Sequence, residues 1–527
     1  MGLLHLLESA AMPTIGQAVY ATVSISLLLF AIHVLRMRVF HPLRRYPGPW
    51  LNSVSEIPAA WALLRGRQPK VYKQLHDKYG PIVRVAPNEL SFIDVEAWDD
   101  IYGFHKSTPN FEKSPIFIGA VSPVDGQTGV SLANNTEHTR QRRALAAPFT
   151  NRALLQQEGI LQLHVDKLMA ALTARARRGE AVNLAEWLTY TTFDIIGDVC
   201  FAEPFGCLDA GRSNEWARAI IGVFKAATWD QAIRRVAGTG TPLHRLLVRL
   251  VVPAEAAKWR RAHFDNSREK TLRRLAAAAD KDEKARHPDL IKHILDSADP
   301  RAALSPTEIV LNMVLFISAG SETTANTMTG WAYLMLRDPA ALARAAAEVR
   351  AAFSSPGDIC WESVHARVPY LDASLDEALR LFSPAPSNAQ RVVPAGGAVV
   401  AGERLPAGTT VAVAPWAAVH TARHFADPDR FAPERWLDGE GADPAFKEDR
   451  RAASRPFGTG PRGCMGKNLA YLELRLILAR LLWHFDLTPA EGPAARECMR
   501  RWDEGDMDAY QTWMKPDLWV DLKEAQR

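Results

Sequence analysis

The chain has 527 residues, of which 47% are hydrophobic and 23% charged, and its formal net charge is +4. This composition is ordinary for a globular protein, and the small net charge gives no reason to expect nucleic-acid binding. The five cysteines are odd in number and contain no C-x-x-C pair, which argues against a disulfide framework and against a zinc site. Because no Gly/Ser linker, long charge run or repeat divides the chain, we expect one large, mainly helical body.

An uncharged apolar segment near the N-terminus is long enough to span a bilayer. Residues 14–35, TIGQAVYATVSISLLLFAIHVL, contain no Asp, Glu, Lys or Arg. The chain after them is basic, with Arg36, Arg38, Arg44 and Arg45. The positive-inside rule then places the rest of the chain on the cytoplasmic side. A cleaved signal peptide is the alternative, but the basic residues lie on the wrong side of the apolar run for one.

Three parts of the chain follow from this pattern. We expect a membrane anchor over residues 1–36, and a proline-rich hinge over residues 37–50. The prolines of the segment HPLRRYPGPW should make the hinge a stiff, non-helical connector. Residues 51–527 would then form the body of the protein.

The segment LSPTEIVLNMVLFISAGSETTANTMTGWAYLMLRDP, residues 304–339, predicts one long, buried helix. Ser305 suits the N-cap, Pro306 suits the first helical position, and Glu308 completes a capping box. About 30 residues with a rise of 1.5 Å each make roughly 45 Å, which is enough to cross a whole domain. We therefore expect this helix to lie at the centre of the body.

The middle of the predicted helix is polar where burial is expected. Gly320 is a poor helix former, and four polar residues, 321–324, follow it. Ala319 and Gly320 lie on the same face as Thr323, so small side chains should leave a groove with a hydroxyl at its edge. The residues alone also allow a purely structural interpretation, in which Thr323 bonds back to a helix carbonyl and Glu322 reaches a surface partner.

A second helix is predicted in the first half of residues 370–394. Glu377 and Arg380 are three residues apart on it and can pair, although most such pairs are weak surface ion pairs. Arg435, further along the chain, offers a second guanidinium. If both guanidiniums met Glu377, they would form a buried bidentate network.

Cys464 lies just before a strongly apolar predicted helix, GKNLAYLELRLILARLLWHF, residues 466–485. Its sulfur would lie near unpaired backbone N–H groups at the positive helix end, and Arg462 and Lys467 add positive charge. We therefore expect a thiolate, which could serve as a nucleophile, a redox thiol or an axial metal ligand. The sequence offers neither a neighbouring base nor a resolving cysteine. A single thiolate on a rigid turn fits a haem ligand best.

The residues around this cysteine form the pattern F-x-x-G-x-R-x-C-x-G, at Phe457, Gly460, Arg462, Cys464 and Gly466. The pattern resembles the cysteine loop of the cytochrome P450 family. Further features of that family occur in the expected order, namely A-G-x-E-T-T at 319–324, E-x-x-R at 377–380 and P-E-R-W at 433–436. The resemblance covers nearly the whole chain. The segments around 433–436 and 466–485 are similar to microsomal enzymes of filamentous fungi that tailor secondary metabolites.

The resemblance implies a mainly α fold, a helical prism with small β-sheet regions, together with the N-terminal transmembrane helix. It implies haem b (iron protoporphyrin IX) between the long helix and the cysteine loop, with Cys464 as the axial ligand of the iron. Histidine at position 138 stands where the family more often has tryptophan. The other haem-binding positions would be Phe457, Gly460, Arg462, Gly466, Ala319, Gly320, His138, Arg142 and Arg391.

The resemblance also implies roles around the haem. Thr323 and Glu322 would form the acid–alcohol pair that delivers protons while dioxygen is activated. Glu377, Arg380 and Arg435 would form a structural triad that supports the cysteine loop. Substrate contacts are expected from residues 111–132, with Phe117 and Ile118 as apolar wall candidates, and from 213–243, 319–324, 384–390 and 507–513. The segment SPAPSNAQR before Arg391 departs from the usual proline pair of the family, in a region that normally touches substrate.

We therefore expect a single-pass monooxygenase of the endoplasmic reticulum membrane with its body in the cytoplasm. It would take electrons from NADPH through a cytochrome reductase, with cytochrome b5 as a further donor. A basic face with Arg140, Arg143 and Lys467 would dock the reductase. The substrate would be a small, lipophilic intermediate of secondary metabolism, polyketide ahead of terpenoid or indole-derived, which the enzyme hydroxylates, epoxidises or desaturates.

Two other functions remain open at this point. An oxygen-independent haem-thiolate isomerase or dehydratase is one, and the pair of Glu322 and Thr323 argues against it. A membrane-tethered haem sensor or carrier is the other. It would need a second strong protein ligand for the iron, and residues 304–339 contain no histidine to supply one.

Overall fold

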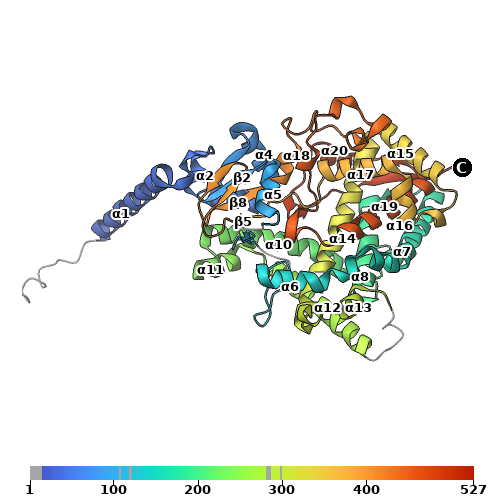
Figure 1. Ribbon diagram of the computed structural model, residues 1–527, viewed down its shortest axis with the longest axis horizontal. Coiled ribbons are helices and arrows are strands. Elements are labelled where there is room, and N and C mark those ends of the chain that lie inside the picture. The colour runs from blue at the N-terminus through green and yellow to red at the C-terminus, as the bar shows by residue number, and fades with distance from the viewer. Residues whose placement is uncertain (1–14, 106–108, 118–121, 280–286, 297–298, 527) are drawn as a thin grey trace, which may run out of the picture.

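The computed structural model describes residues 15–105, 109–117, 122–279, 287–296 and 299–526. Helices make up most of this part of the chain, and small β-sheets lie beside them (Figure 1). The mainly α architecture with small sheets confirms the predicted fold class.

The helices and strands have the following bounds. The α-helices are α1 (Ile15–Leu35), α2 (Trp50–Val54), α3 (Ile57–Leu64), α4 (Gln68–Tyr79), α5 (Glu96–Tyr102), α6 (Asn135–Leu145), α7 (Asn151–Arg177), α8 (Leu184–Phe201), α9 (Cys207–Ala210), α10 (Glu215–Ala237), α11 (Pro242–Val251), α12 (Ala254–Ala279), α13 (Leu290–Leu295), α14 (Pro306–Arg337), α15 (Pro339–Ala352), α16 (Trp361–Arg367), α17 (Pro369–Leu381), α18 (Pro415–Val419), α19 (Lys467–His484) and α20 (Pro493–Asp503). The strands are β1 (Ile82–Ala86), β2 (Glu89–Phe92), β3 (Glu112–Lys113), β4 (Val182–Asn183), β5 (Arg391–Val392), β6 (Ala398–Val400), β7 (Glu403–Leu405), β8 (Thr410–Val413), β9 (Phe485–Pro489), β10 (Ala509–Tyr510), β11 (Thr512–Trp513) and β12 (Trp519–Glu524).

Helix α14 runs through the helical body and is the long helix that the sequence predicts (Figure 1). Its capping box is present, since the Glu308 amide donates to Ser305 Oγ at 3.1 Å and the Ser305 amide donates to the Glu308 carboxylate at 2.9 Å. The helix packs against α8, α12, α17 and α19, and most of its residues are buried. The apolar side chains of these helices form the larger hydrophobic core. α14 is thereby held rigidly beside α19, the helix that follows Cys464.

The largest sheet forms a second, smaller core with the helices α4, α5 and α18. Its strand order is β1-β2-β8-β5-β3, with β2 and β8 parallel and the other neighbours antiparallel. In the pairing of β3 with β5, Lys113 lies opposite Arg391. The sheet thus brings two basic residues together, although they are far apart in the sequence.

The N-terminal helix α1 projects from the body (Figure 1). Together with a π-helical turn, Arg36–Phe40, it makes a 26-residue helix with none of its apolar window buried and with a mean hydropathy of 2.1. This helix is long and apolar enough to cross a membrane, and it extends four residues, 37–40, into the predicted hinge.

The expectation of a non-helical connector was wrong, because Pro42–Arg45 form a 3-10 turn. Proline suits the first position of such a turn, where its missing N–H is not needed. The side chain of His41 completes the turn by accepting from the Leu43 amide at 3.2 Å.

Candidate active site

An apolar cavity of about 320 Å³ lies between α14 and the loop that carries Cys464. Thr323 is one of the few polar residues on its α14 wall, and the Cys464 sulfur is reached from inside it. A neighbouring cavity of about 190 Å³ shares three wall residues with it, namely Leu379, Ala385 and Pro456. The two cavities are therefore adjacent, with these three residues between them.

The cysteine loop is fixed by backbone contacts. The Cys464 amide donates to the Phe457 carbonyl at 2.8 Å, and the Phe457 ring packs on Tyr471 with 5.2 Å between ring centroids. Gly460 has φ of +69°, and a Cβ there would lie 1.9 Å from the Tyr102 carbonyl oxygen. Only glycine fits this position, because any side chain would be strained and would also clash with backbone.

The environment of Cys464 differs from the expectation in one respect. Cys464 opens into the cavity, but the protein around it keeps its sulfur away from bulk water, which raises the pKa of its thiol. This effect outweighs the Gly466 amide, Arg142 and Lys467, which all lower the pKa. The electropositive groups that the sequence predicts are present and lower the pKa of the thiol, but removal of the sulfur from water opposes them. A coordinated metal ion deprotonates a thiol outright, so the thiolate form depends on metal binding.

Buried basic groups gather beside the cysteine loop. Burial and the neighbouring Arg391 lower the pKa of Arg462 to about 10. Its Nη2 donates to the Ala133 carbonyl at 2.8 Å, but its buried Nη1 has no partner among the described residues. Lys113 is close enough to be influenced by both arginines, and burial lowers its pKa well below the ordinary value. Glu112 lies 3.5 Å from Arg462, but its side chain is half exposed. The buried donor that remains unpaired calls for a further anion, and the carboxylates of a haem fit it.

Helix α6 carries two further residues that were predicted to bind haem, His138 and Arg142. His138 is buried, and this burial together with Arg462 and Arg142 lowers its pKa to about 3, so the imidazole is neutral. Arg142 Nη1 donates to the Gly463 carbonyl at 2.8 Å, directly before Cys464. Arg142 therefore contacts the backbone of the cysteine loop in this structure.

The predicted proton-delivery residues have separate hydrogen-bond partners. Thr323 Oγ1 lies on the cavity wall and donates to the Ala319 carbonyl at 2.6 Å. The carboxylate of Glu322 accepts from Lys515 Nζ at 2.6 Å, and both of these side chains are less than 10% exposed. Sequence reasoning missed Lys515, since nothing in its local segment marks it as a partner of α14.

The absence of a side chain at Gly320 also allows close helix packing, in addition to forming the predicted groove. It lies on the cavity wall, and a Cβ there would come within 2.6 Å of Ile196 Cδ1 on α8. Glycine therefore lets α8 approach α14 closely at the level of the cavity. Ala319, one residue earlier, also lines the cavity.

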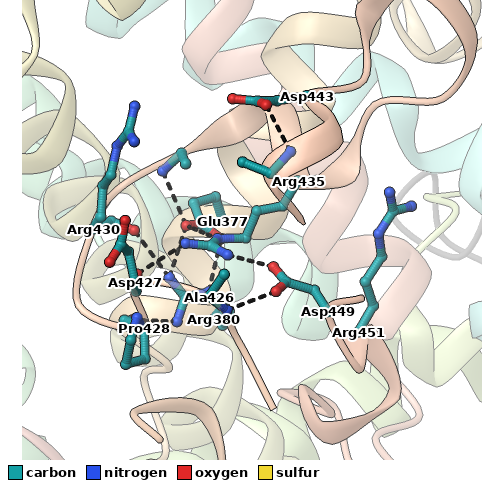
Figure 2. Close-up of polar contacts among 12 residues, drawn as sticks. Glu377, Arg380, Ala426, Asp427, Pro428, Arg430, Arg435, Asp443, Asp449 and Arg451 are labelled. Carbon is teal, nitrogen blue, oxygen red and sulfur yellow. Dashed lines mark hydrogen bonds and ion pairs between the residues drawn. The ribbon is translucent and has the colours of Figure 1, made fainter. Parts of the chain in front are cut away.

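Glu377, Arg380 and Arg435 come together in the interior (Figure 2). Arg380 donates twice to Glu377, both at 2.8 Å, and Arg435 Nε donates to the same carboxylate at 3.0 Å. All three side chains are 0% exposed. Arg435 also pairs with Asp449, which connects the cluster to the chain leading into the cysteine loop.

The predicted substrate segments contribute unequally to the cavity. Residues 319–324 and 384–390 supply wall residues, whereas no described residue of 111–132, 213–243 or 507–513 lines either cavity. Phe117 packs under Lys113 Nζ at 4.0 Å from its ring centroid, and Ile118 lies outside the described residues.

A thiol that reaches an apolar cavity, with buried cations beside it, is an arrangement that suits a haem-thiolate site. The family model described as Cytochrome P450 matches residues 49–504, so the chain belongs to the cytochrome P450 family. This membership brings with it the haem-thiolate cofactor and the family's general use of redox-partner reductases.

The chain is similar to curated fungal enzymes. Cytochrome P450 monooxygenase ABA2 of Pyricularia oryzae is 76% identical over 523 residues, which is 99% of each chain. Cytochrome P450 monooxygenase aba2 of Botryotinia fuckeliana is 54% identical over 526 residues, 99% of this chain and 97% of the relative. Averantin hydroxylase of Dothistroma septosporum is 37% identical over 501 residues, 94% of this chain and 90% of the relative. The protein is a cytochrome P450 monooxygenase, similar to fungal enzymes of secondary metabolism.

Proposed function

We propose that this monooxygenase binds haem b and hydroxylates a small, lipophilic intermediate of secondary metabolism. The observation that supports the proposal best is the apolar cavity that has Cys464 at one side and Thr323 on the opposite wall. The apolar residues of its α14 wall, Leu315, Phe316 and Ala319, would face the space beside the haem, which favours a lipophilic substrate. Hydroxylation is the reaction for which one relative, averantin hydroxylase, is named. A polyketide is the substrate class we favour.

The residues around the cavity have distinct proposed roles in holding the haem. Cys464 is the axial ligand, and Arg462 and Arg391 hold the carboxylates, with Lys113 beside them. When bound, the haem supplies the activation of dioxygen and the oxidation of the substrate C–H bond. Phe457, Gly466, Ala319 and Gly320 line the slot that the macrocycle would fill. Gly460 would act through the shape of the cysteine loop, where it packs against Tyr102. His138 and Arg142 of α6 are proposed to reach a carboxylate of the haem.

Thr323 and Glu322 are proposed to handle the protons of the reaction. Thr323 holds a hydroxyl at the cavity wall, and its lone pairs are free to accept while its proton is donated to the Ala319 carbonyl. Glu322 would relay a proton, taken up from water, to Thr323, which would pass it on. Because Glu322 is paired with Lys515, its side chain has to leave this lysine before it can serve the cavity.

The remaining predicted residues act through the protein scaffold. Glu377, Arg380 and Arg435 fix the segment that leads into the cysteine loop, since Arg435 also holds Asp449. They are supporting residues, because Glu377 and Arg435 line neither cavity, and Arg380, which lines the smaller one, uses its guanidinium on Glu377 and backbone carbonyls.

The division of the chain follows the same proposal. Residues 1–36 anchor the protein in the endoplasmic reticulum membrane, residues 37–50 are the hinge, and residues 51–527 form the catalytic domain in the cytoplasm. The long apolar helix supports the anchor, and the arginines after it support the orientation.

Electrons come from NADPH through a cytochrome reductase, with cytochrome b5 as a further donor. The arginines of the basic face differ in how far their charge is already used in ion pairs within the protein. Arg140 is paired with Glu137 and Glu308, whereas the Arg143 side chain is 59% exposed and pairs with Asp299 only at 3.4 Å. Of these two arginines, Arg143 offers the charge that an acidic partner can use.

Co-expression with an NADPH-cytochrome reductase tests the proposal. Cells that contain the wild type should form a product that carries one labelled oxygen atom from labelled dioxygen, and cells with Cys464→Ser should not. A product formed without dioxygen or NADPH would instead identify an isomerase or dehydratase. No turnover of any lipophilic candidate by a protein with a normal haem spectrum would favour a sensor or carrier.

A further inference from the structure

A buried ion pair joins Glu322 of α14 to Lys515 near the C-terminal end of the chain, and the proposed function gives Lys515 no role of its own. The Glu322 carboxylate and Lys515 Nζ lie 2.6 Å apart, and their side chains are 6% and 9% exposed. Removing two charges from water is costly, so a buried ion pair is weak evidence for a stabilising role. The position of this pair beside the cavity suggests another role.

Glu322 does not line the cavity that its neighbour Thr323 lines. Each residue of an α-helix is rotated by about 100° from the one before it, so the two side chains leave α14 in different directions. Thr323 is on the wall of the larger cavity, whereas Glu322 is not among the described residues that line either cavity. While the ion pair is closed, the carboxylate is therefore held outside the cavity.

The backbone at Lys515 is fixed by the hairpin of β10 and β11, which ends two residues before it. Asn326, four residues after the glutamate on α14, donates to Thr512 Oγ1 at 2.7 Å and to the Trp513 carbonyl at 3.2 Å. Trp513 is 1% exposed, and its Nε1 donates to the Ser383 carbonyl at 2.9 Å. Because α14 itself holds the hairpin, the lysine is presented to the glutamate from a constant position.

We propose that Lys515 is a positioning residue for the reaction, which holds the Glu322 carboxylate outside the haem cavity until this side chain is released. Once released, the glutamate side chain can turn toward Thr323 and the cavity. Lys515 thereby sets when Glu322 is available to relay a proton. The inference rests on the proposed function, because it takes the cavity to be the haem site and Glu322 to be the proton relay.

The C–O stretching frequency of the ferrous carbonyl complex tests this role, because it responds to polar groups that enter the cavity. Wild type, Lys515→Met and the double variant Lys515→Met/Glu322→Ala are compared as full-length, haem-loaded proteins in lipid nanodiscs. Lys515→Met should shift the frequency, because the released glutamate reaches the cavity. The double variant should return the frequency to the wild-type value, because it no longer has the carboxylate.

Two controls separate release of the carboxylate from a general disturbance. Lys515→Arg keeps a cation at this position and should keep the wild-type frequency. Lys270→Met also breaks a pair with a mostly buried lysine, at 2.6 Å from Glu203, but neither residue lines a cavity, so the frequency should not change. If Lys515→Met takes up no haem, Lys515→Gln, which is uncharged but still forms hydrogen bonds, replaces it in the comparison.

Two results would overturn the proposal. One is a frequency that does not change when Lys515 is replaced. The other is a change that persists in the double variant, since it would come from a displaced hairpin and not from the carboxylate. A purely structural ion pair predicts this second pattern.

These outcomes are separate from the fate of the proposed function, because the carbonyl measurement needs no turnover. A product made with labelled dioxygen, together with a frequency that is the same in wild type and Lys515→Met, would leave the proposed function intact and remove this inference. The expected pattern of frequencies in a protein that forms no oxygenated product would support the hold on Glu322 and remove the proposed reaction.

Discussion

Replacing Glu377 with glutamine is expected to destabilise the folded protein by about 3–5 kcal/mol, because it removes the negative charge between two buried guanidiniums. The carboxylate accepts hydrogen bonds from Arg380, Arg435, Trp436 and the Ala432 amide. Two donors reach Oε2 and three reach Oε1. A glutamine must turn its NH₂ group toward one of these sets, so at least two buried donors lose their acceptor.

Each donor that loses its acceptor costs about 1–3 kcal/mol. Two such losses together are of the same size as the cost of breaking a buried ion pair. Domains are commonly stable by about 5–15 kcal/mol, so the variant should retain haem poorly at growth temperature. Urea unfolding of wild type and variant, followed by tryptophan fluorescence and by haem absorption, measures the difference. Glu180→Gln is the matched control, and its exposed pair with Arg178 should be worth no more than about 1 kcal/mol. If Glu377→Gln and Glu180→Gln shift the unfolding midpoint equally, the reasoning about the buried network is wrong.

Three further predictions address the cysteine loop, the long helix and the buried acid. Gly460→Ala should lose haem, because the substitution combines left-handed strain of about 1–2 kcal/mol with a clash at the Tyr102 carbonyl. Gly505→Ala should bind haem normally, because Gly505 has a similar φ of +59° but no atom lies within 4 Å of the added Cβ. Equal haem contents would contradict this packing argument. Thr323→Ala should keep the haem spectrum and form on the order of tenfold less product per NADPH consumed. The control, Thr329→Ala, removes a buried hydroxyl that bonds to the Ala325 carbonyl, and it should form as much product per NADPH as the wild type. Unchanged coupling in Thr323→Ala would remove that residue from the mechanism. Glu473 is a buried residue of α19, and burial raises the pKa of its carboxyl from 4.5 to about 8. Between these two pH values the folded state binds more protons than the unfolded state. The stability of wild type relative to Glu473→Gln should therefore fall as the pH rises from 4.5 to about 8. Urea midpoints of the two proteins across this range check the sign, and a relative stability that rises with pH would refute it.

The features that sequence predicts well are local ones. The capping box of α14 needs only Ser305, Pro306 and Glu308, whose spacing fixes their hydrogen bonds. The cysteine loop is recognised in the same way, because its glycines and its cysteine lie close together in the sequence, within residues 457–466. The sequence could also name Glu377, Arg380 and Arg435, but it could not show that they meet at one carboxylate.

The features that the sequence could not show depend on pairing between distant segments. Lys515 meets Glu322, and Lys113 lies opposite Arg391, only because the fold brings their segments together. The thiol of Cys464 shows the other difficulty, since its local sequence favours the thiolate while burial by the whole site opposes it. Glu473 did carry a signal, as an acid on an apolar helix, but its place on the wall of the cavity appears only in three dimensions.

The bond between the Cys464 sulfur and a haem iron is the centre of this account, and the absorption spectrum of the carbon monoxide complex tests it most directly. The reduced wild-type protein should show the red-shifted band of a thiolate-ligated haem, and Cys464→Ser should lack that band. A wild type that stays without this band after haem supplementation, or a serine variant that keeps it, would show that another side chain holds the iron.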